Sequence, residues 1–96
     1  MPKTREEAVA MLQSTHAFQG PFSFKAIGAN DVAFSAAVAQ MAVLVVGPRV
    51  QPTLSSRESK NGRHLAVTMT VRCQSAEQVL DIYDAIGRVP GLKMLL

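Results

Sequence analysis

The chain of 96 residues is poor in cysteine and in aromatic residues. Cys73 is its one cysteine, so neither an internal disulfide nor a zinc site built from cysteines can form. Cysteine usage of this kind is typical of a reducing compartment, and we expect a cytoplasmic protein. Cys73 falls in an apolar series, which predicts a buried and unreactive thiol.

No segment has the features of an export signal or a membrane span. The first seven residues, Met-Pro-Lys-Thr-Arg-Glu-Glu, contain no apolar core, and no apolar run reaches the ~20 residues that a spanning helix needs. We therefore expect no contact with a membrane. With 48% hydrophobic and 18% charged residues, the composition indicates one small folded domain rather than a disordered chain.

Residue types that carry catalysis or bind metals are scarce. His16 and His64 have no cysteine, histidine or carboxylate at the spacing of metal ligands. Ser55, Ser56 and Ser59 precede His64, but serines that flank a turn usually serve as capping hydroxyls. A Gly-rich phosphate loop is also missing. The sequence therefore predicts a protein that is not an enzyme and that uses no cofactor.

The clearest local pattern is that of a β-hairpin. Asn61 and Gly62 form the dipeptide that favours a type I′ turn, because both tolerate positive φ. Apolar and polar residues alternate over 65–73, as in a strand with one buried face. The other strand is expected over 50–57 at a sheet edge, because Pro52 cannot donate a hydrogen bond to a ladder.

Two capping boxes predict helices on either side of this hairpin region. Thr4 and Glu7 begin a short leading helix that should end near Thr15. Ser75 and Gln78 begin an amphipathic helix with an acidic outer side. The leading helix belongs to a predicted N-terminal extension, residues 1–19.

The remaining residues, 20–96, are expected to form one domain with the element order βαββαβ. Phe22 and Phe24 give the first strand, to Gly28, an aromatic core face. In the last strand, Leu92, Met94 and Leu96 alternate with Lys93 and Leu95. Two right-handed crossovers then give a ferredoxin-like α+β sandwich, with a four-stranded antiparallel sheet of order 4-1-3-2 and two helices on one face. The predicted core comprises Phe22, Phe24, Leu65, Val67, Met69, Val71, Val79, Ile82, Tyr83 and Leu92.

The segment 32–46 contains no charged residue and is predicted to be the first of these two helices. A helix that is apolar all round is usually buried on more than one side. We expect its outer side to be covered by another subunit or by the leading helix, through Met11, Leu12 and Phe18. The expected core stripe is Phe34, Val38, Met41 and Val45, and the candidate oligomer contacts are Ala36, Val43 and Leu44.

Several segments in order resemble the YbeD-like small bacterial proteins of unknown function, whose fold is similar to the ACT regulatory domain. They include Phe22-Ser-Phe-Lys-Ala-Ile-Gly28 and Arg57-Glu-Ser-Lys-Asn-Gly62, and the resemblance covers residues 22–96. His64 stands where that family usually has Tyr or Phe, and its first helix normally carries charges. The resemblance implies a module that binds a small effector near a subunit interface. The implied candidate ligand-binding residues are Gly28, Asn30 and Asp31.

The expected charge distribution offers an alternative. Six of the seven acidic residues fall in the predicted helices or their caps. Basic residues that fall in or beside the predicted strands are Lys25, Arg57, Arg63, Arg72 and Lys93. Sheets of this topology bind RNA when aromatic residues of the central strands stack on bases, but Ala66, Thr68 and Thr70 occupy such positions here. Candidate anion-binding residues are Lys25, Arg57, Lys60, Arg63, His64, Arg72 and Lys93.

Two functional hypotheses follow. The first is a non-catalytic, ACT-like regulatory or interaction module that forms a homo-oligomer and binds a small effector or a protein partner. The alternative is anion or RNA binding through an open basic sheet face, with nucleic acid the less favoured ligand.

Overall fold

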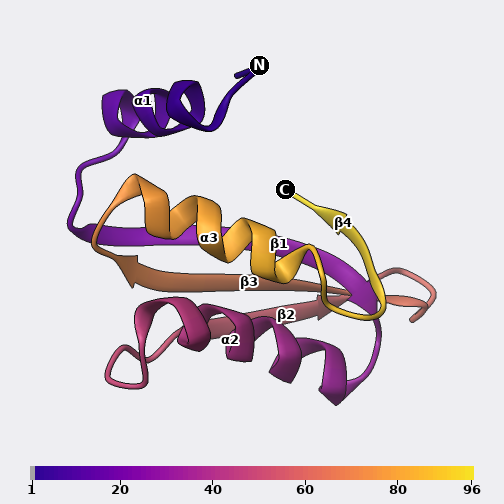
Figure 1. The fold of residues 1–96 in the computed structure, drawn as a ribbon. Helices are drawn as coiled ribbons and strands as arrows, with labels where there is room; N and C mark the ends of the chain where they lie inside the picture. Colours follow the sequence, from indigo (N-terminus) through magenta and orange to yellow (C-terminus); the bar gives the residue numbers. More distant parts are fainter. Residues whose placement is uncertain (1) are drawn as a thin grey trace.

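The computed structural model describes residues 2–96, and this part of the chain forms three helices and four strands (Figure 1). The elements are α1 (Arg5–Thr15), β1 (Gly20–Ala29), α2 (Val32–Val46), β2 (Thr53–Glu58), β3 (His64–Cys73), α3 (Ala76–Ile86) and β4 (Leu92–Leu95). None of these helices is both long and apolar enough to cross a bilayer.

The four strands form one antiparallel sheet in the order β2-β3-β1-β4, which is 4-1-3-2 when it is read from the opposite edge. The long central strands pair along their whole length, from Gly20 opposite Cys73 to Ala29 opposite His64. Helices α2 and α3 cover one face of the sheet and leave the other open (Figure 1). The predicted α+β fold with a four-stranded antiparallel sheet is thus confirmed.

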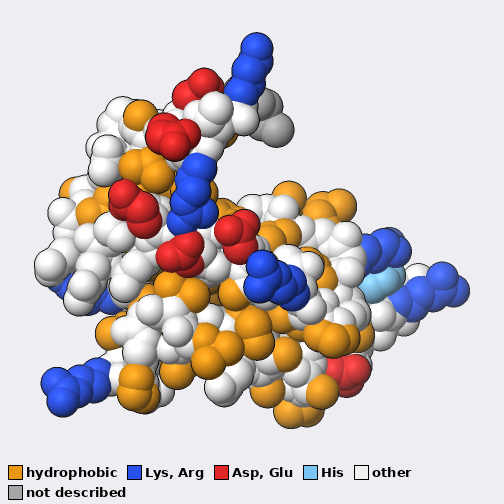
Figure 2. All heavy atoms as spheres, in the orientation of Figure 1, with side chains coloured by type: hydrophobic (Ala, Val, Ile, Leu, Met, Phe, Trp, Pro, Cys, Tyr) orange, Lys and Arg blue, Asp and Glu red, His pale blue; other side chains and the backbone are white. Residues whose placement is uncertain are grey.

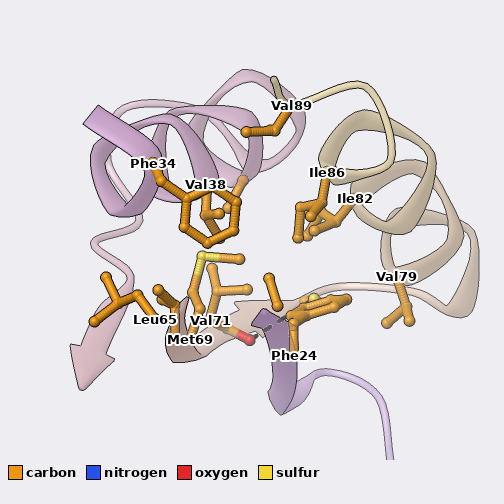
Figure 3. Packing of buried hydrophobic residues seen from close by; sticks show 14 residues of the cluster. Phe24, Phe34, Val38, Leu65, Met69, Val71, Val79, Ile82, Ile86 and Val89 are labelled. Atoms are coloured by element: carbon orange, nitrogen blue, oxygen red, sulfur yellow. Dashed lines mark hydrogen bonds between the residues drawn. The ribbon is translucent and has the colours of Figure 1, made fainter. Parts of the chain in front are cut away.

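The core lies between the sheet and these two helices (Figure 3). Every second residue of β3 from Leu65 to Cys73 is buried, as the alternation predicted. From the helical layer, Phe34 and Val38 of α2 and Ile82 of α3 point toward the sheet (Figure 3). Three residues of the predicted core, Phe22, Tyr83 and Leu92, are only half-buried at its margin.

The buried stripe of α2 differs from the predicted one. Phe34 and Val38 are buried as expected, but the third buried residue is Ala42, whereas Met41 and Val45 are half-buried. The reason is that α2 packs against α3 as well as against β1 and β3, so the residues between these neighbours are the ones that lose contact with water.

The hairpin between β2 and β3 is confirmed, but its turn is not of type I′. A type I′ turn needs positive φ at both central residues, and Gly62 has a φ of 72° while Asn61 does not have a positive φ. The turn instead closes through Gly62 N–H, which donates to Ser59 O at 2.9 Å. The Ser59 hydroxyl also accepts a hydrogen bond from His64 N at 3.0 Å, which stabilises the longer loop. Pro52 lies just before β2, so the predicted edge strand begins later than expected.

A bulge in β4 changes which of its side chains face the core. Leu92 lies opposite Gly28 but Met94 lies opposite Ile27, so Lys93 is an extra residue in the ladder. The strict alternation predicted for the last strand is therefore wrong. Leu92 and Leu95 pack against the core, and the Met94 side chain is 50% exposed.

The predicted caps are present at the beginning of α1 and α3. The Thr4 hydroxyl accepts from Glu7 N at 3.1 Å, and the Ser75 hydroxyl accepts from Gln78 N at 3.2 Å. The Glu7 and Gln78 side chains accept from the backbone N–H of the residue before each cap, at 3.0 and 2.8 Å. In the standard capping box this side chain accepts from the N–H of the cap residue itself, so each box here extends one residue further toward the N-terminus.

Candidate functional site

The three candidate ligand-binding residues at the end of β1 each have a structural partner. The Asp31 carboxylate caps α2 by accepting from Phe34 N at 2.7 Å. The Asn30 amide donates to Glu58 Oε1 at 3.1 Å and to Gly62 O at 2.8 Å, so it ties this loop to the hairpin. Gly28 belongs to β1 and has no positive φ, so its backbone conformation does not require a glycine.

Gly28 is required for a different reason, which is the close approach of its neighbours. A Cβ at this position would lie 2.5 Å from the Phe34 ring and 2.6 Å from Gly91 O. The glycine therefore allows α2 and the segment before β4 to approach β1 at one point.

A shallow groove of about 430 Å³ lies beside the beginning of α2. Asp31 is its one charged residue, and that carboxylate is already bonded to Phe34 N. The groove is therefore suited to an apolar group rather than to an anion. Its lining residues are Ala29, Asp31, Ala33, Phe34, Ala37, Pro90 and Gly91. Pro90 and Gly91 could not be predicted from the sequence, because they reach the groove only through the packing of β4 beside β1.

The outer side of α2 is apolar and open to solvent. We call it the α2 outer face and define it by Val32, Ala36, Val43 and Leu44. Val32 is 83% exposed and Leu44 is 67% exposed, while Ala36 is exposed and Val43 half-buried. Figure 2 shows uncharged side chains over α2, whereas acidic side chains gather over α1 and α3.

The leading helix does not cover this face, which corrects one of the two predicted arrangements. Helix α1 lies beyond α3, on the side away from α2 (Figure 1). Arg5 forms ion pairs with Asp81 and Asp84 of α3. Of the residues expected to cover α2, Leu12 and Phe18 pack at the margin of the core and Met11 is 49% exposed.

The candidate anion-binding residues occupy the sheet face opposite the helices and its hairpin end, but they are spread widely. Arg72 lies opposite Pro21 at one end of β3, and His64 lies at the other end, roughly 27 Å away at ~3.4 Å per residue. The Lys93 ammonium lies 3.4 Å from His64 Nε2. Lys60 and Arg63 belong to the hairpin loop.

Lys25 and Arg57 are brought together on this face. Both line a hollow of about 190 Å³ over β3. The other lining residues are Ser55, Ser56, Ala66 and Thr68. The sequence predicted both as anion-binding residues, but their position around one hollow depends on the register of three strands.

Ser59 and Cys73, two groups that could take part in nucleophilic chemistry, are engaged or buried. The Ser59 hydroxyl accepts from the His64 backbone rather than from its ring. Cys73 is fully buried, and this burial raises the pKa of its thiol from 9.0 to about 11. Within residues 2–96, no three His, Cys, Asp or Glu side chains come close enough together to hold a metal ion.

Comparison with known proteins agrees with the resemblance seen in the sequence. A "UPF0250 protein" of Nitrosomonas europaea is 29% identical over 75 residues, which cover 78% of this chain and 86% of that protein. The family model described as "Protein of unknown function (DUF493)" matches residues 13–96, from within α1 through β4. The resemblance to YbeD-like small proteins of unknown function is thus confirmed, and the chain belongs to the DUF493 family.

Proposed function

We propose that this protein is a non-catalytic, ACT-like regulatory or interaction module that acts as a homo-oligomer in the cytoplasm. In this proposal the α2 outer face contacts a second copy of the chain, and the groove beside α2 receives a small effector. The element order after α1 and the sheet order support a ferredoxin-like assignment, which is the fold of ACT domains.

The observation that carries the proposal is the contrast between the two helices of the same layer. Helix α3 presents Glu77, Asp81 and Asp84 to solvent, as a helix that covers one sheet face normally does. Helix α2 has 15 residues and no charge, and its outer face exposes large apolar side chains. Contiguous apolar surface of this kind usually marks a site of interaction.

A second copy is the partner that this surface suits best. In a two-fold dimer the same patch faces itself, so a patch with charges of one sign would repel its partner. The α2 outer face contains no charge and can pack against itself, whereas the acidic surface of α1 and α3 cannot do so without repulsion.

The size of the contact indicates that α2 alone is not enough. A helix of this length presents a strip roughly 22 Å long and 10 Å wide, or about 220 Å². Stable interfaces bury about 800 Å² on each partner. The neighbouring edge strand β2 would extend the contact, because all six of its residues are exposed and Leu54, on the helix side, is 42% exposed.

The groove is the part of the proposal that concerns an effector. It adjoins the α2 outer face through Ala33 and Ala37, so a ligand there would lie near the contact between subunits. Its apolar lining favours an effector with an apolar side chain.

The test is the molar mass in solution, measured by light scattering over a range of concentrations. We expect the wild-type chain to be an oligomer and Leu44→Glu or Val43→Glu to be a folded monomer, because each variant places a charge in a dry contact. Gln13→Glu adds the same charge on α1 and should leave the mass unchanged. Circular dichroism checks that each variant is folded.

Deletion of residues 1–19 is the second control. Because α1 packs against α3 rather than α2, the shortened chain should keep the oligomeric state. A wild-type chain that stays monomeric at high concentration, or an oligomer that both glutamate variants leave intact, would contradict the proposal.

A further inference from the structure

The hollow over β3 lies on the sheet face that the helices leave open, away from the α2 outer face. Its geometry follows from the register of three strands. Ser55, Thr68 and Lys25 lie side by side across β2, β3 and β1. Arg57 and Ala66 lie opposite each other in the next row, which continues to Ile27.

Short side chains form the floor of this hollow and long ones form its walls. Ala66 and Thr68 of the middle strand are the floor, and Lys25 and Arg57 rise from the strands on either side. Those two strands are two spacings apart, or about 10 Å. Lysine and arginine side chains are long enough to reach from both walls toward one group above the floor.

Among the described residues, Lys25 and Arg57 have no acidic neighbour on this face. Five of the seven Asp and Glu residues are on helices α1 and α3, and the other two are the cap Asp31 and Glu58. Glu58 faces the helix side, since it pairs with the buried Leu65, and it accepts a hydrogen bond from Asn30. The ion pairs found in residues 2–96 involve Arg5 and neither Lys25 nor Arg57.

We infer that the hollow formed by Lys25, Arg57, Ser55 and Thr68 binds a phosphate group. Arginine presents paired N–H donors that match the oxygens of a phosphate, and lysine supplies a second charge from the opposite wall. The Ser55 and Thr68 hydroxyls, adjacent in one row, can donate to the remaining oxygens. The lining has no aromatic side chain on which a base could stack, so the phosphate is the recognised group.

This phosphate could belong to a small ester or to a nucleic-acid backbone, and the experiment separates the two sources. The full chain is titrated with inorganic phosphate and, in parallel, with a single-stranded oligoribonucleotide. Binding is monitored through the backbone amide signals in NMR spectra. We expect saturable shifts at Lys25, Ala66 and Thr68. Saturation by inorganic phosphate indicates a small ligand, and saturation only by the oligonucleotide indicates the backbone.

Charge-removing variants show whether the hollow itself is the site. Lys25→Gln and Arg57→Gln should each weaken binding by about tenfold or more, because each removes a charge-assisted hydrogen bond. Arg49→Gln is the matched control, since Arg49 is an exposed cation in the loop before β2 and does not line the hollow. The affinity of the Arg49→Gln variant for the same probe should stay within about twofold of the wild-type affinity.

Two results would overturn the inference. One is the absence of saturable shifts with both probes. The other is equal weakening by Arg57→Gln and Arg49→Gln, which would mean that the ligand responds only to net charge.

Discussion

Replacement of Gly28 by alanine tests the closest contact in the fold. In a strand interior, alanine is normally better than glycine by roughly 0.5–1 kcal/mol, because glycine loses more backbone entropy on folding. Gly28 has no positive φ, so its backbone conformation would accept alanine. From propensity alone, Gly28→Ala should be neutral or stabilising.

The packing around Gly28 predicts the opposite. The new Cβ would lie 2.5 Å from Cε1 and Cζ of Phe34 and 2.6 Å from Gly91 O. Neither neighbour can move away freely, because Phe34 is 2% exposed within the core and Gly91 O accepts from Ala29 N at 3.1 Å. Forcing a methyl group into packed surroundings costs about 1–3 kcal/mol, which exceeds the gain in backbone entropy. We therefore expect a net loss of stability.

The stability is measured by unfolding in urea, with circular dichroism as the signal. The transition midpoint should fall at an unchanged slope, because the variant alters stability rather than the surface exposed on unfolding. Gly87→Ala is the control: Gly87 has φ of −57° and ψ of −17°, and its nearest atoms to a Cβ are 3.4 Å away. That variant should be neutral or stabilising by up to about 1 kcal/mol.

A double-mutant cycle identifies the cause. In a Phe34→Leu background the cost of Gly28→Ala should shrink, because the smaller side chain leaves room for the new methyl group. A Gly28→Ala chain as stable as wild type, or a cost that is the same in both backgrounds, would refute the role assigned to this contact.

Two further predictions concern the core. Val67→Asp places a carboxylate at a position that is 0% exposed and should prevent folding, so a soluble variant with a cooperative melt would mean that the faces of β3 are wrongly assigned. Burial raises the pKa of the Cys73 thiol to about 11, above its ordinary value of 9.0, so the folded chain holds this proton to higher pH than the unfolded chain. The free energy of unfolding should therefore fall as pH rises from 9.0 toward about 11, and Cys73→Ala should reduce this fall. The same pH dependence in wild type and Cys73→Ala would contradict this prediction. Part of the fall should remain, because burial also raises the pKa of Tyr83.

Features that depend on neighbours in the sequence could be predicted well. The buried face of β3 follows from alternation within one strand, and α2 spans the uncharged segment 32–46 that was predicted to be a helix. Both patterns are local, so the chain segment itself determines them.

Features that depend on tertiary contacts could not be predicted. Periodicity placed Met41 in the core, but packing between α3 and the sheet buries Ala42 instead. The bulge at Lys93 was hidden for the same reason, because an extra residue in a ladder is defined only by the partner strand. The prediction of a type I′ turn rested on the preference of the Asn61-Gly62 dipeptide, which the additional bonds of Ser59 override.

The candidate site shows the same division. The sequence identified Lys25 and Arg57 as basic residues of strands, but only the pairing of β2 with β3 and of β3 with β1 places them around one hollow. The resemblance implied Asn30 as a ligand-binding residue, and only the structure shows that its amide joins this loop to the hairpin.

Strand β2 contributes to both proposed surfaces without a conflict between them. Because successive side chains of a strand point to opposite faces, Leu54 faces the helical layer while Ser55 and Arg57 face the open side of the sheet. A dimer formed through the α2 outer face would therefore leave the phosphate hollow accessible. The charge pattern favours the same division, since the contact with a second copy needs a surface without charge and the phosphate needs unpaired cations. Loss of oligomerisation in Leu44→Glu consequently says nothing against the hollow, and loss of phosphate binding in Arg57→Gln says nothing against the dimer.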